Sequence, residues 1–293
     1  MQPYEILESS FAKWIGVKHA ISVNTGTAAL HVTLAALGIG PGDKVLVPDF
    51  TYISTAWAVT YCGATPVFYL PDKFMKVGDD IKAIVVAHIY GVPERMALMN
   101  PGIPVIEDAC EAHGAMIDGK MVGSLGTAGC FSFQASKIIN SQEGGIITTN
   151  DDELAAKIRT MKSTANDGKY NHKYLAFNYR MPNAIAELAL KSFSDVEKNL
   201  KRREEIWFIY DSYLRGVGKP WVEGQVAWVY PISEEVPWGR EFFKSAQAQP
   251  PYNGPNVAPC GTVLPIDPGM SDEEVHALAQ KVEKFIGRKY NYD

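Results

Sequence analysis

Short, almost continuously apolar segments recur between residues 19 and 150, each bounded by glycine, proline or polar residues. They are HAISVN, DKVLVPD, TPVFYL, IKAIVVAH, IPVIEDA, TAGCFSF and GGIITTN. Because several are apolar throughout rather than alternating, they are typical of strands whose two faces are both covered. Segments between them, such as TAALHVTLAALG and YISTAWAVTYCG, have helical spacing. The pattern predicts an α/β fold with a mostly parallel, seven-stranded sheet flanked by helices.

The pattern becomes mainly helical after residue 150. DDELAAKIRTMKS opens with acids and closes with bases, as the helix dipole favours. A second helical segment runs from Pro182 to Leu214 and is long enough that we expect a bend or break. Residues 215–262 are rich in proline and glycine, with one plausible strand at VAWVYPI, and a final helix starts near Ser271. We therefore divide the chain into a large α/β domain, 1–205, and a small C-terminal domain, 206–293.

Charge and cysteine usage narrow the class of protein. The chain has 28 Lys plus Arg against 33 Asp plus Glu, a net charge of −5, which disfavours a nucleic-acid binder. The opening segment MQPYEILESSFAKWIG has no apolar stretch, so we expect no signal or transit peptide and a mature chain that begins there. No apolar run approaches the roughly 20 residues that span a bilayer. Four unevenly spaced cysteines without a CxxC pair fit a reducing compartment, and we expect a soluble, cytoplasmic protein with no membrane partner.

Polar residues follow four of the predicted strands at their carboxyl ends, where α/β sheets bind ligands. They are residues 24–27, 49–52, 108–111 and 132–137. Gly26 and Thr27 open a helix after the first strand, so their amides could bind a phosphate. Taken alone, the stretch is better explained by Thr25 capping the helix and Gly26 making the turn.

A lysine and a carboxylate are the other candidates for chemistry. Lys137 lies in a loop of small and polar residues just past an apolar strand, where partial desolvation would favour a nucleophilic amine. Most lysines are solvated surface charges, so this position by itself favours that interpretation over catalysis. Asp108 ends an apolar strand, where a carboxylate needs a partner.

A metal site formed by Asp108, Cys110 and His113 is the less favoured explanation of that segment. Strand alternation places residues 108 and 110 on one side, while the chain has turned before residue 113, and the sequence offers no second ligand cluster. We therefore predict no metal.

The candidates together match the requirements of pyridoxal 5'-phosphate (PLP). A helix end takes the phosphate, a carboxylate such as Asp108 keeps the ring nitrogen protonated, and a lysine such as Lys137 forms an imine with the aldehyde. Tyr52, which follows the second strand, could stack on the ring, although it could equally be an ordinary aromatic at the top of the sheet. The combination predicts a PLP-dependent enzyme.

Several longer motifs, in order along the chain, resemble the DegT/DnrJ/EryC1/StrS family of sugar aminotransferases. They are HAISVNTGTAALH, VPDFTYIST, IEDACEAHGA, GSLGTAGCFSFQASKIINSQEGG and FNYRMPNAIAELAL. The resemblance runs from the first residues to about residue 205 and returns in VLPIDPGMSDEEV. It implies a PLP-dependent transferase fold of type I and a homodimer with active sites at the subunit interface. Within the family, IEDACEAHGA and FNYRM resemble the nucleotide-sugar 4-aminotransferases most.

The resemblance also implies roles for individual residues around the cofactor ring. Lys137 falls on the lysine that forms the imine, Asp108 on the partner of the pyridinium nitrogen and Tyr52 on the stacking aromatic. Glu111 falls beside the ring hydroxyl, where many relatives have Gln or His.

Four further residues fall on the family's phosphate site. Gly26 and Thr27 match its helix end, and Ser132 matches a hydroxyl that contacts the phosphate. Asn178, in FNYRM, matches an asparagine that reaches the phosphate from the neighbouring subunit.

The resemblance implies a ping-pong reaction. Glutamate would donate its amine to the cofactor, and the 4-keto group of a nucleotide-linked 6-deoxyhexose would then receive it. A dehydrating branch of the family has histidine in place of the lysine, so Lys137 favours amine transfer. The leader before FAKWIG is absent and residues 215–262 form a shorter section than relatives have, so we expect complete cofactor chemistry with reduced sugar recognition. Two alternatives stay open: another PLP reaction, such as sugar dehydration or decarboxylation, or a truncated relative that binds cofactor or sugar as a partner or regulator without turnover.

Overall fold

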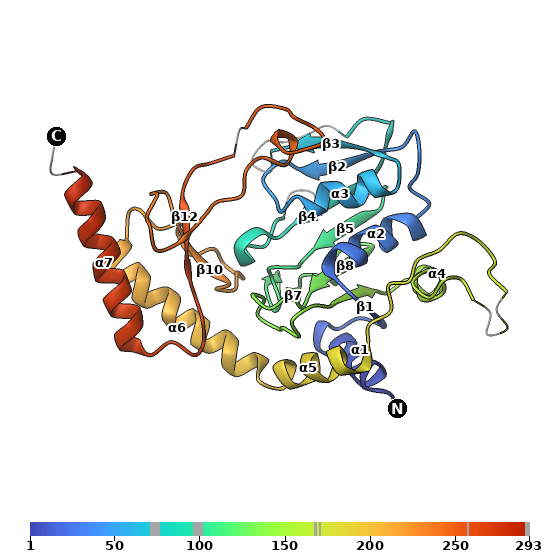
Figure 1. Cartoon of the computed structure of the whole chain (residues 1–293), viewed down its shortest axis with the longest axis horizontal. Coiled ribbons are helices and arrows are strands. Elements are labelled where there is room, and N and C mark those ends of the chain that lie inside the picture. The colour runs from blue at the N-terminus through green and yellow to red at the C-terminus, as the bar shows by residue number, and fades with distance from the viewer. Residues whose placement is uncertain (71–76, 96–101, 167–168, 170, 257, 291–293) are drawn as a thin grey trace.

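A seven-stranded sheet forms the centre of the larger part of the molecule (Figure 1). The computed structural model describes residues 1–70, 77–95, 102–166, 169, 171–256 and 258–290. In sheet order the strands are β1 (His19–Val23), β9 (Gly145–Thr149), β8 (Ala128–Ser132), β5 (Val105–Asp108), β4 (Ile81–Ala87), β2 (Lys44–Pro48) and β3 (Thr65–Tyr69). Strand β9 is antiparallel to both neighbours and the other pairings are parallel. The predicted mostly parallel sheet is confirmed, and each predicted segment supplies one strand.

Helices cover both faces of this sheet. One face carries α2 (Gly26–Ala36), α3 (Ser54–Tyr61) and α4 (Asp152–Met161), and the other carries α1 (Pro3–Ile15) and α5 (Asn183–Ser194). Neighbouring strand residues therefore enter different cores: Ile147 packs in the first and Ile146 in the second. Burial on both sides is why these strands lack polar alternation.

The first helix, α1, was not predicted. Its signal is local: Gln2 and Glu5 form a capping box around Pro3, and the Gln2 amide donates to Glu5 Oε2 at 2.7 Å. Leu7 and Phe11, four residues apart, bury the helix against the sheet.

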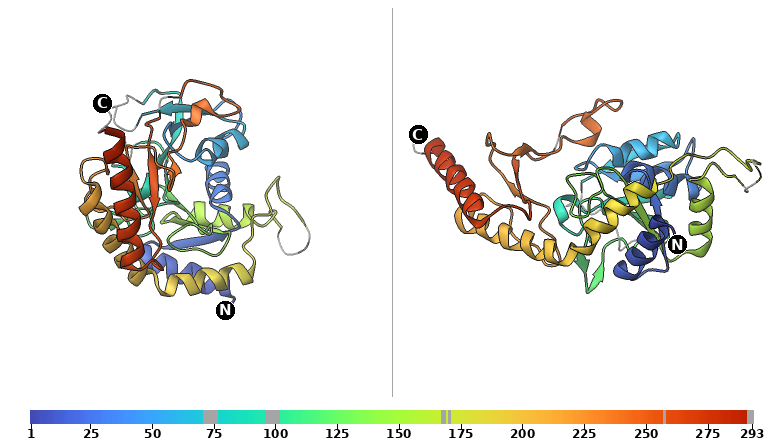
Figure 2. Two further views of the ribbon diagram at one scale, coloured as in Figure 1. Left: turned by 60° about the vertical axis from the view of Figure 1, so that its left-hand side comes forward. Right: turned by 60° about the horizontal axis from the view of Figure 1, so that its bottom comes forward.

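The long helical segment breaks as predicted. Helix α5 ends at Ser194, Asp195 leaves the helical region at φ −102° and ψ 8°, and α6 (Val196–Leu214) follows. Helices α6 and α7 (Asp272–Tyr290) pack on a three-stranded sheet of β10 (Val229–Ile232), β12 (Thr262–Pro265) and β11 (Arg240–Glu241) (Figures 1 and 2). These elements have their own apolar core, and α6 itself spans the boundary that we predict at residue 205.

Within this C-terminal part, the strand predicted at VAWVYPI is confirmed as β10 and the final helix as α7. Ser271 Oγ accepts a hydrogen bond from the Glu274 amide at 3.2 Å, as expected of an N-cap. Strands β11 and β12 were not predicted, because they are short and follow glycine- and proline-rich chain. None of the helices in the described ranges has the length and apolarity to cross a bilayer.

A segment of the C-terminal part returns to the large sheet. The Asp49 carboxylate, directly after β2, accepts hydrogen bonds from the backbone and the side-chain amides of Gln247, at 3.0 and 3.3 Å. Trp57 of α3 donates to the Pro250 carbonyl at 3.0 Å. Residue 49, which lies in one of the predicted ligand-binding stretches, is therefore an anchor that holds the small sheet beside the strand ends.

Candidate active site

A cavity of about 620 Å³ lies at the carboxyl ends of the strands, a volume typical of small-molecule sites. We call it the active-site cavity. The predicted site residues that line it are Gly26, Thr27, Tyr52, Asp108, Glu111, Ser132 and Lys137. The three-dimensional structure therefore brings together every predicted site residue except Asn178.

The first turn of α2 forms one wall of the active-site cavity. Thr25 caps this helix, since its Oγ1 accepts from the Ala28 amide at 2.9 Å, which confirms the structural explanation for that residue. The amides of Gly26 and Thr27 precede the first intrahelical bonds and have no hydrogen-bond partner among the described residues. They give the cavity an anion-attracting wall.

Gly26 is required by how closely α2 approaches β8. A Cβ atom at residue 26 would lie 2.8 Å from Ser132 Cβ and 3.0 Å from Cys110 Sγ, closer than side chains allow. The absent side chain lets the Ser132 hydroxyl lie at the end of the helix. Hydrogen-bond donors from two distant segments therefore converge on one place.

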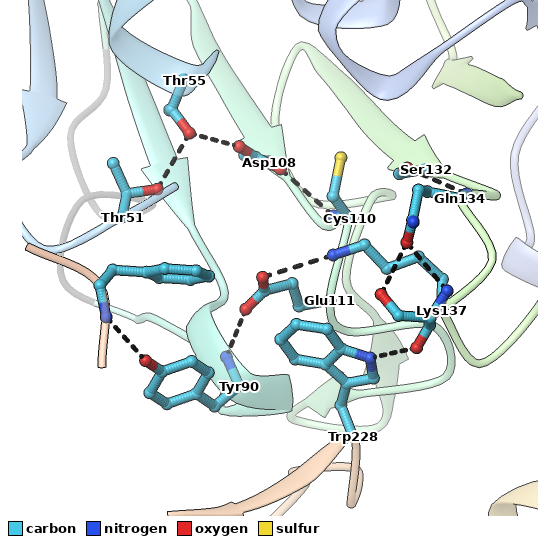
Figure 3. Close-up of polar contacts among 12 residues, drawn as sticks. Thr51, Thr55, Tyr90, Asp108, Cys110, Glu111, Ser132, Gln134, Lys137 and Trp228 are labelled. Atoms are coloured by element: carbon cyan, nitrogen blue, oxygen red, sulfur yellow. Dashed lines mark hydrogen bonds and ion pairs between the residues drawn. The ribbon is translucent and has the colours of Figure 1, made fainter. Parts of the chain in front are cut away.

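Asp108 is held by a short chain of hydroxyl groups. Thr55 Oγ1 donates to Asp108 Oδ2 at 2.7 Å, and Thr51 Oγ1 lies 2.9 Å from Thr55 Oγ1 (Figure 3). The Cys110 amide donates to Asp108 Oδ1 at 3.2 Å. Because these contacts fix the position of the carboxylate, Asp108 can face a cationic group across the cavity.

The neighbouring acid on β5, Glu107, has a structural task. It is fully buried and accepts hydrogen bonds from the backbone amides of Gly123, Leu125 and Gly126 and from His88 Nε2 at 3.1 Å. Burial raises the pKa of Glu107, but the hydrogen bonds from His88 and the backbone outweigh it and hold the pKa below its usual value. Because successive side chains on a strand point to opposite faces, the Glu107 carboxylate lies among buried backbone amides and the Asp108 carboxylate lines the active-site cavity.

Lys137 and Glu111 point toward each other in the cavity (Figure 3). Lys137 Nζ lies 3.4 Å from Glu111 Oε1, and the Tyr90 amide donates to Glu111 Oε2 at 2.9 Å. The two side chains are 13% and 5% exposed, so the amine is largely desolvated as predicted. Burial raises the pKa of Glu111 above its usual value although the Lys137 charge opposes this. The pair can hold and exchange a proton.

Sequence reasoning missed Trp228, Tyr90 and Arg240 at this site. Lys137 Nζ lies 4.1 Å from the ring centroid of Trp228, and the indole N–H donates to the Ser136 carbonyl at 2.8 Å. Tyr90 stacks on Trp228 at 6.2 Å between centroids. Trp228 lies in the predicted strand VAWVYPI and Arg240 in the following chain without periodicity. Both are about a hundred residues from Lys137, so no local signal connects them with it.

Tyr52 lies at the outer rim of the cavity. It is 54% exposed, and its ring centroid is 5.8 Å from that of Phe243. An aromatic ring in this place can cover a planar ligand bound below it.

Asn178 lies outside the active-site cavity of its own chain. It is exposed and forms an isolated β-bridge with Ser163, within the segment between α4 and α5 that projects from the body of the molecule (Figures 1 and 2). The amide of Asn24 donates to the Tyr179 carbonyl at 3.0 Å, which fixes the base of this segment beside β1. The predicted contact with a neighbouring subunit stays a prediction.

The side chains present fit PLP. Open amides and a hydroxyl gather at the end of α2, a fixed carboxylate lies on β5, and a shielded primary amine lies in the loop after β8. This donor set supplies one partner each for a phosphate, a pyridinium and an aldehyde.

Comparison with known proteins gives independent information. Residues 3–236 match the model of the DegT/DnrJ/EryC1/StrS aminotransferase family. The GDP-perosamine synthase of Caulobacter vibrioides is 42% identical over 252 residues, which cover 77% of this chain and 67% of that enzyme. The GDP-perosamine synthase of Vibrio cholerae is 36% identical over 227 residues, 72% of this chain and 62% of that enzyme. The part of this chain that matches therefore covers about two thirds of the length of each of these two relatives. Among solved structures, DesV of S. venezuelae, in complex with a ketimine intermediate, superposes with a TM-score of 0.88 at 26% identity, covering 97% of this chain and 89% of that one.

Proposed function

Because this chain belongs to the DegT/DnrJ/EryC1/StrS aminotransferase family, whose members depend on PLP, we propose that it moves an amine from glutamate to the 4-keto group of a nucleotide-linked 6-deoxyhexose. The resemblance of IEDACEAHGA and FNYRM to GDP-perosamine synthase agrees with the identity to the Caulobacter and Vibrio enzymes and favours this acceptor. The observation that carries the proposal is the convergence of Lys137, Asp108 and the α2 end on one cavity.

Each residue has a task that follows from its surroundings. When bound, PLP supplies an aldehyde that exchanges amines and a ring that withdraws electrons from the substrate carbon. Gly26, Thr27 and Ser132 would hold the phosphate, and Asp108, fixed by Thr55, would keep the ring nitrogen protonated. Bound in this way, the cofactor would share the cavity with Lys137.

Lys137 moves the proton. Its amine lies in a shielded cavity, where it would act as the base that takes a proton from the substrate carbon. Glu111, 3.4 Å away, can receive or return a proton at Lys137 Nζ. Trp228 covers the same amine and limits access of water to it.

The proposal includes a homodimer in the cytoplasm. Asn178 is exposed and does not line its own active-site cavity, a placement suited to contact with the phosphate site of a neighbouring subunit. All four cysteines carry free thiols, which supports a reducing compartment.

The test begins with PLP-loaded protein that is treated with borohydride and digested. We expect one pyridoxylated peptide, fixed at Lys137. We also expect the absorption band of lysine-bound PLP to bleach when glutamate is added. GDP-, UDP- and dTDP-linked keto sugars are then supplied with glutamate and the products are read by mass spectrometry. A band that no amino donor alters would favour a binding role without turnover, and no pyridoxylated peptide would refute the enzymatic proposal.

A further inference from the structure

Arg240 lies at the junction of two cavities. A second cavity of about 660 Å³ lies between the loop of Lys137, helix α6 and the small sheet. Ser136, Lys137, Trp228 and Arg240 line this cavity and the active-site cavity alike. A substrate whose reacting end lies at Lys137 can therefore pass Arg240 on its way into the second cavity.

Aromatic rings hold the guanidinium of Arg240. Its Cζ atom lies 5.3 Å from the ring centroid of Trp228 and 5.3 Å from that of Phe243. Contact with ring faces positions the group and leaves its five N–H donors available. Within the described ranges, no carboxylate forms an ion pair with it.

The charges around the active-site cavity make this arginine distinctive. Its lining includes the carboxylates of Asp108, Glu111 and Glu143, and Lys137 and Arg240 are the cations among the described lining residues. Lys137 is paired with Glu111 and becomes neutral when it acts as a nucleophile or base. Arg240 keeps its charge throughout, and it offsets the repulsion that the carboxylates exert on an anionic substrate.

We infer that Arg240 binds an oxyanion of the substrate at the junction of the two cavities. This inference rests on the proposed function. In a ping-pong reaction both substrates bring their reacting atom to Lys137 in turn, and both are anionic: the amino donor carries carboxylates and the nucleotide sugar a diphosphate. The planar fork of an arginine matches either group with paired hydrogen bonds.

Binding of unreactive probes to the PLP-loaded protein tests the inference. Glutarate is the probe in place of the amino donor, because it has both carboxylates and no amine. GDP, UDP and TDP are the probes in place of the nucleotide-sugar acceptor. Calorimetry compares the parent with Arg240→Gln and Arg240→Lys. Arg215→Gln is the matched control, since Arg215 is 84% exposed at the end of α6 and pairs with Asp211. We expect Arg240→Gln to weaken at least one class of probe by about tenfold to hundredfold, with Arg240→Lys intermediate and the control unchanged.

The pattern of loss identifies the oxyanion. Weaker glutarate binding alone assigns the donor carboxylate, weaker nucleotide binding alone assigns the diphosphate, and loss of both assigns one shared site. Arg240→Met, which keeps an apolar stem against Trp228 and Phe243 without the charge, gives a second measurement should Gln disturb β11. Dissociation constants within twofold of the parent for all probes would overturn the inference, as would a parent that binds no probe at millimolar concentration. Failure of the proposed function is distinct, because it shows as a parent without PLP at Lys137 or without amine transfer.

Discussion

The Lys137 amine and the Glu111 carboxylate form a nearly buried pair, 3.4 Å apart, at the point where the sheet meets the C-terminal part of the chain. A solvated ion pair would be held mainly by the attraction of its charges. Here burial of Glu111 outweighs the attraction of Lys137 and raises the pKa of the carboxyl. The contact therefore has a measurable dependence on pH.

Replacing Glu111 by Gln should remove part of the pH dependence of stability. With its pKa raised from 4.5, Glu111 keeps its proton to a higher pH in the folded than in the unfolded chain. The free energy of unfolding therefore falls as pH rises from about 4.5 through the folded pKa. Glutamine has no proton to lose, so we expect a flatter profile of Tm against pH in the cofactor-free variant. Glu143→Gln, at an exposed acid of the same cavity, should keep the parental slope; equal slopes for parent and Glu111→Gln would contradict the assignment.

His113 should lower the free energy of unfolding at acidic pH. Burial lowers its pKa to about 3, with the charge of Lys137 as the next cause. Between about pH 6.5 and 3 the unfolded chain binds a proton there that the folded chain does not, so stability falls as pH falls through this range. In His113→Leu the urea midpoint should fall less between pH 7.5 and pH 5 than in the parent. His276→Leu is the control, because His276 is only half-buried in α7; an unchanged acid sensitivity in His113→Leu would be evidence against this role.

Lys137→Ala should abolish covalent attachment of PLP. The fold should persist, because Lys137 contributes a cavity-lining side chain while the backbone of its loop is held by bonds such as Ser141 N to Phe133 O. Borohydride treatment followed by mass spectrometry should find no pyridoxylated peptide, and turnover should be undetectable. Lys120→Ala, at an exposed hairpin lysine, is the control. Full transaminase turnover in Lys137→Ala would exclude the proposed mechanism.

Asp108→Asn should slow the half-reaction with glutamate without preventing attachment of PLP. The amide has the same shape and can keep the hydrogen bond from Thr55, but it carries no charge to hold a proton on the ring nitrogen. We expect a loss of about a hundredfold or more in the rate observed by stopped flow, comparable with removal of other fixed electrostatic partners. A rate equal to that of the parent would make Asp108 a structural residue.

Mixed dimers test whether Asn178 serves the partner's site. An Asn178→Ala subunit and a Lys137→Ala subunit are each expected to be impaired, yet a mixed dimer would contain one site with both residues intact. Mixing equal amounts should therefore restore up to about a quarter of parental activity, since half of randomly paired dimers are mixed and each has one of two sites. Subunit exchange is verified with tagged chains, and exchange without any recovery would argue against a shared site.

Local sequence predicted much of the sheet and of the cavity. A strand buried on both faces needs a run of apolar residues, so the strands were readable one by one. Residues 25–27, 52, 108–111 and 132–137 lie at the carboxyl ends of strands or within a few residues of them, and the carboxyl ends of parallel strands meet at one edge. Position along the chain was therefore enough to bring these residues together.

Other features depended on contacts that the local sequence does not contain. Glu107 and Asp108 are adjacent acids, and only the pairing of β5 with its neighbours decides which is buried among backbone amides and which faces the cavity. Asp49 directly follows β2 much as Asp108 ends β5, but the Asp49 carboxylate accepts hydrogen bonds from Gln247 and does not face the cavity.

What the sequence by itself determined was the order and type of the main elements and the chemistry available at the strand ends, because these depend on periodicity and on neighbours along the chain. What only the tertiary structure decided was the far wall of the cavity, where Trp228 covers Lys137 and Arg240 joins the second cavity. Both residues are about a hundred positions from Lys137 along the chain, and the packing of the small sheet against the large one places them there.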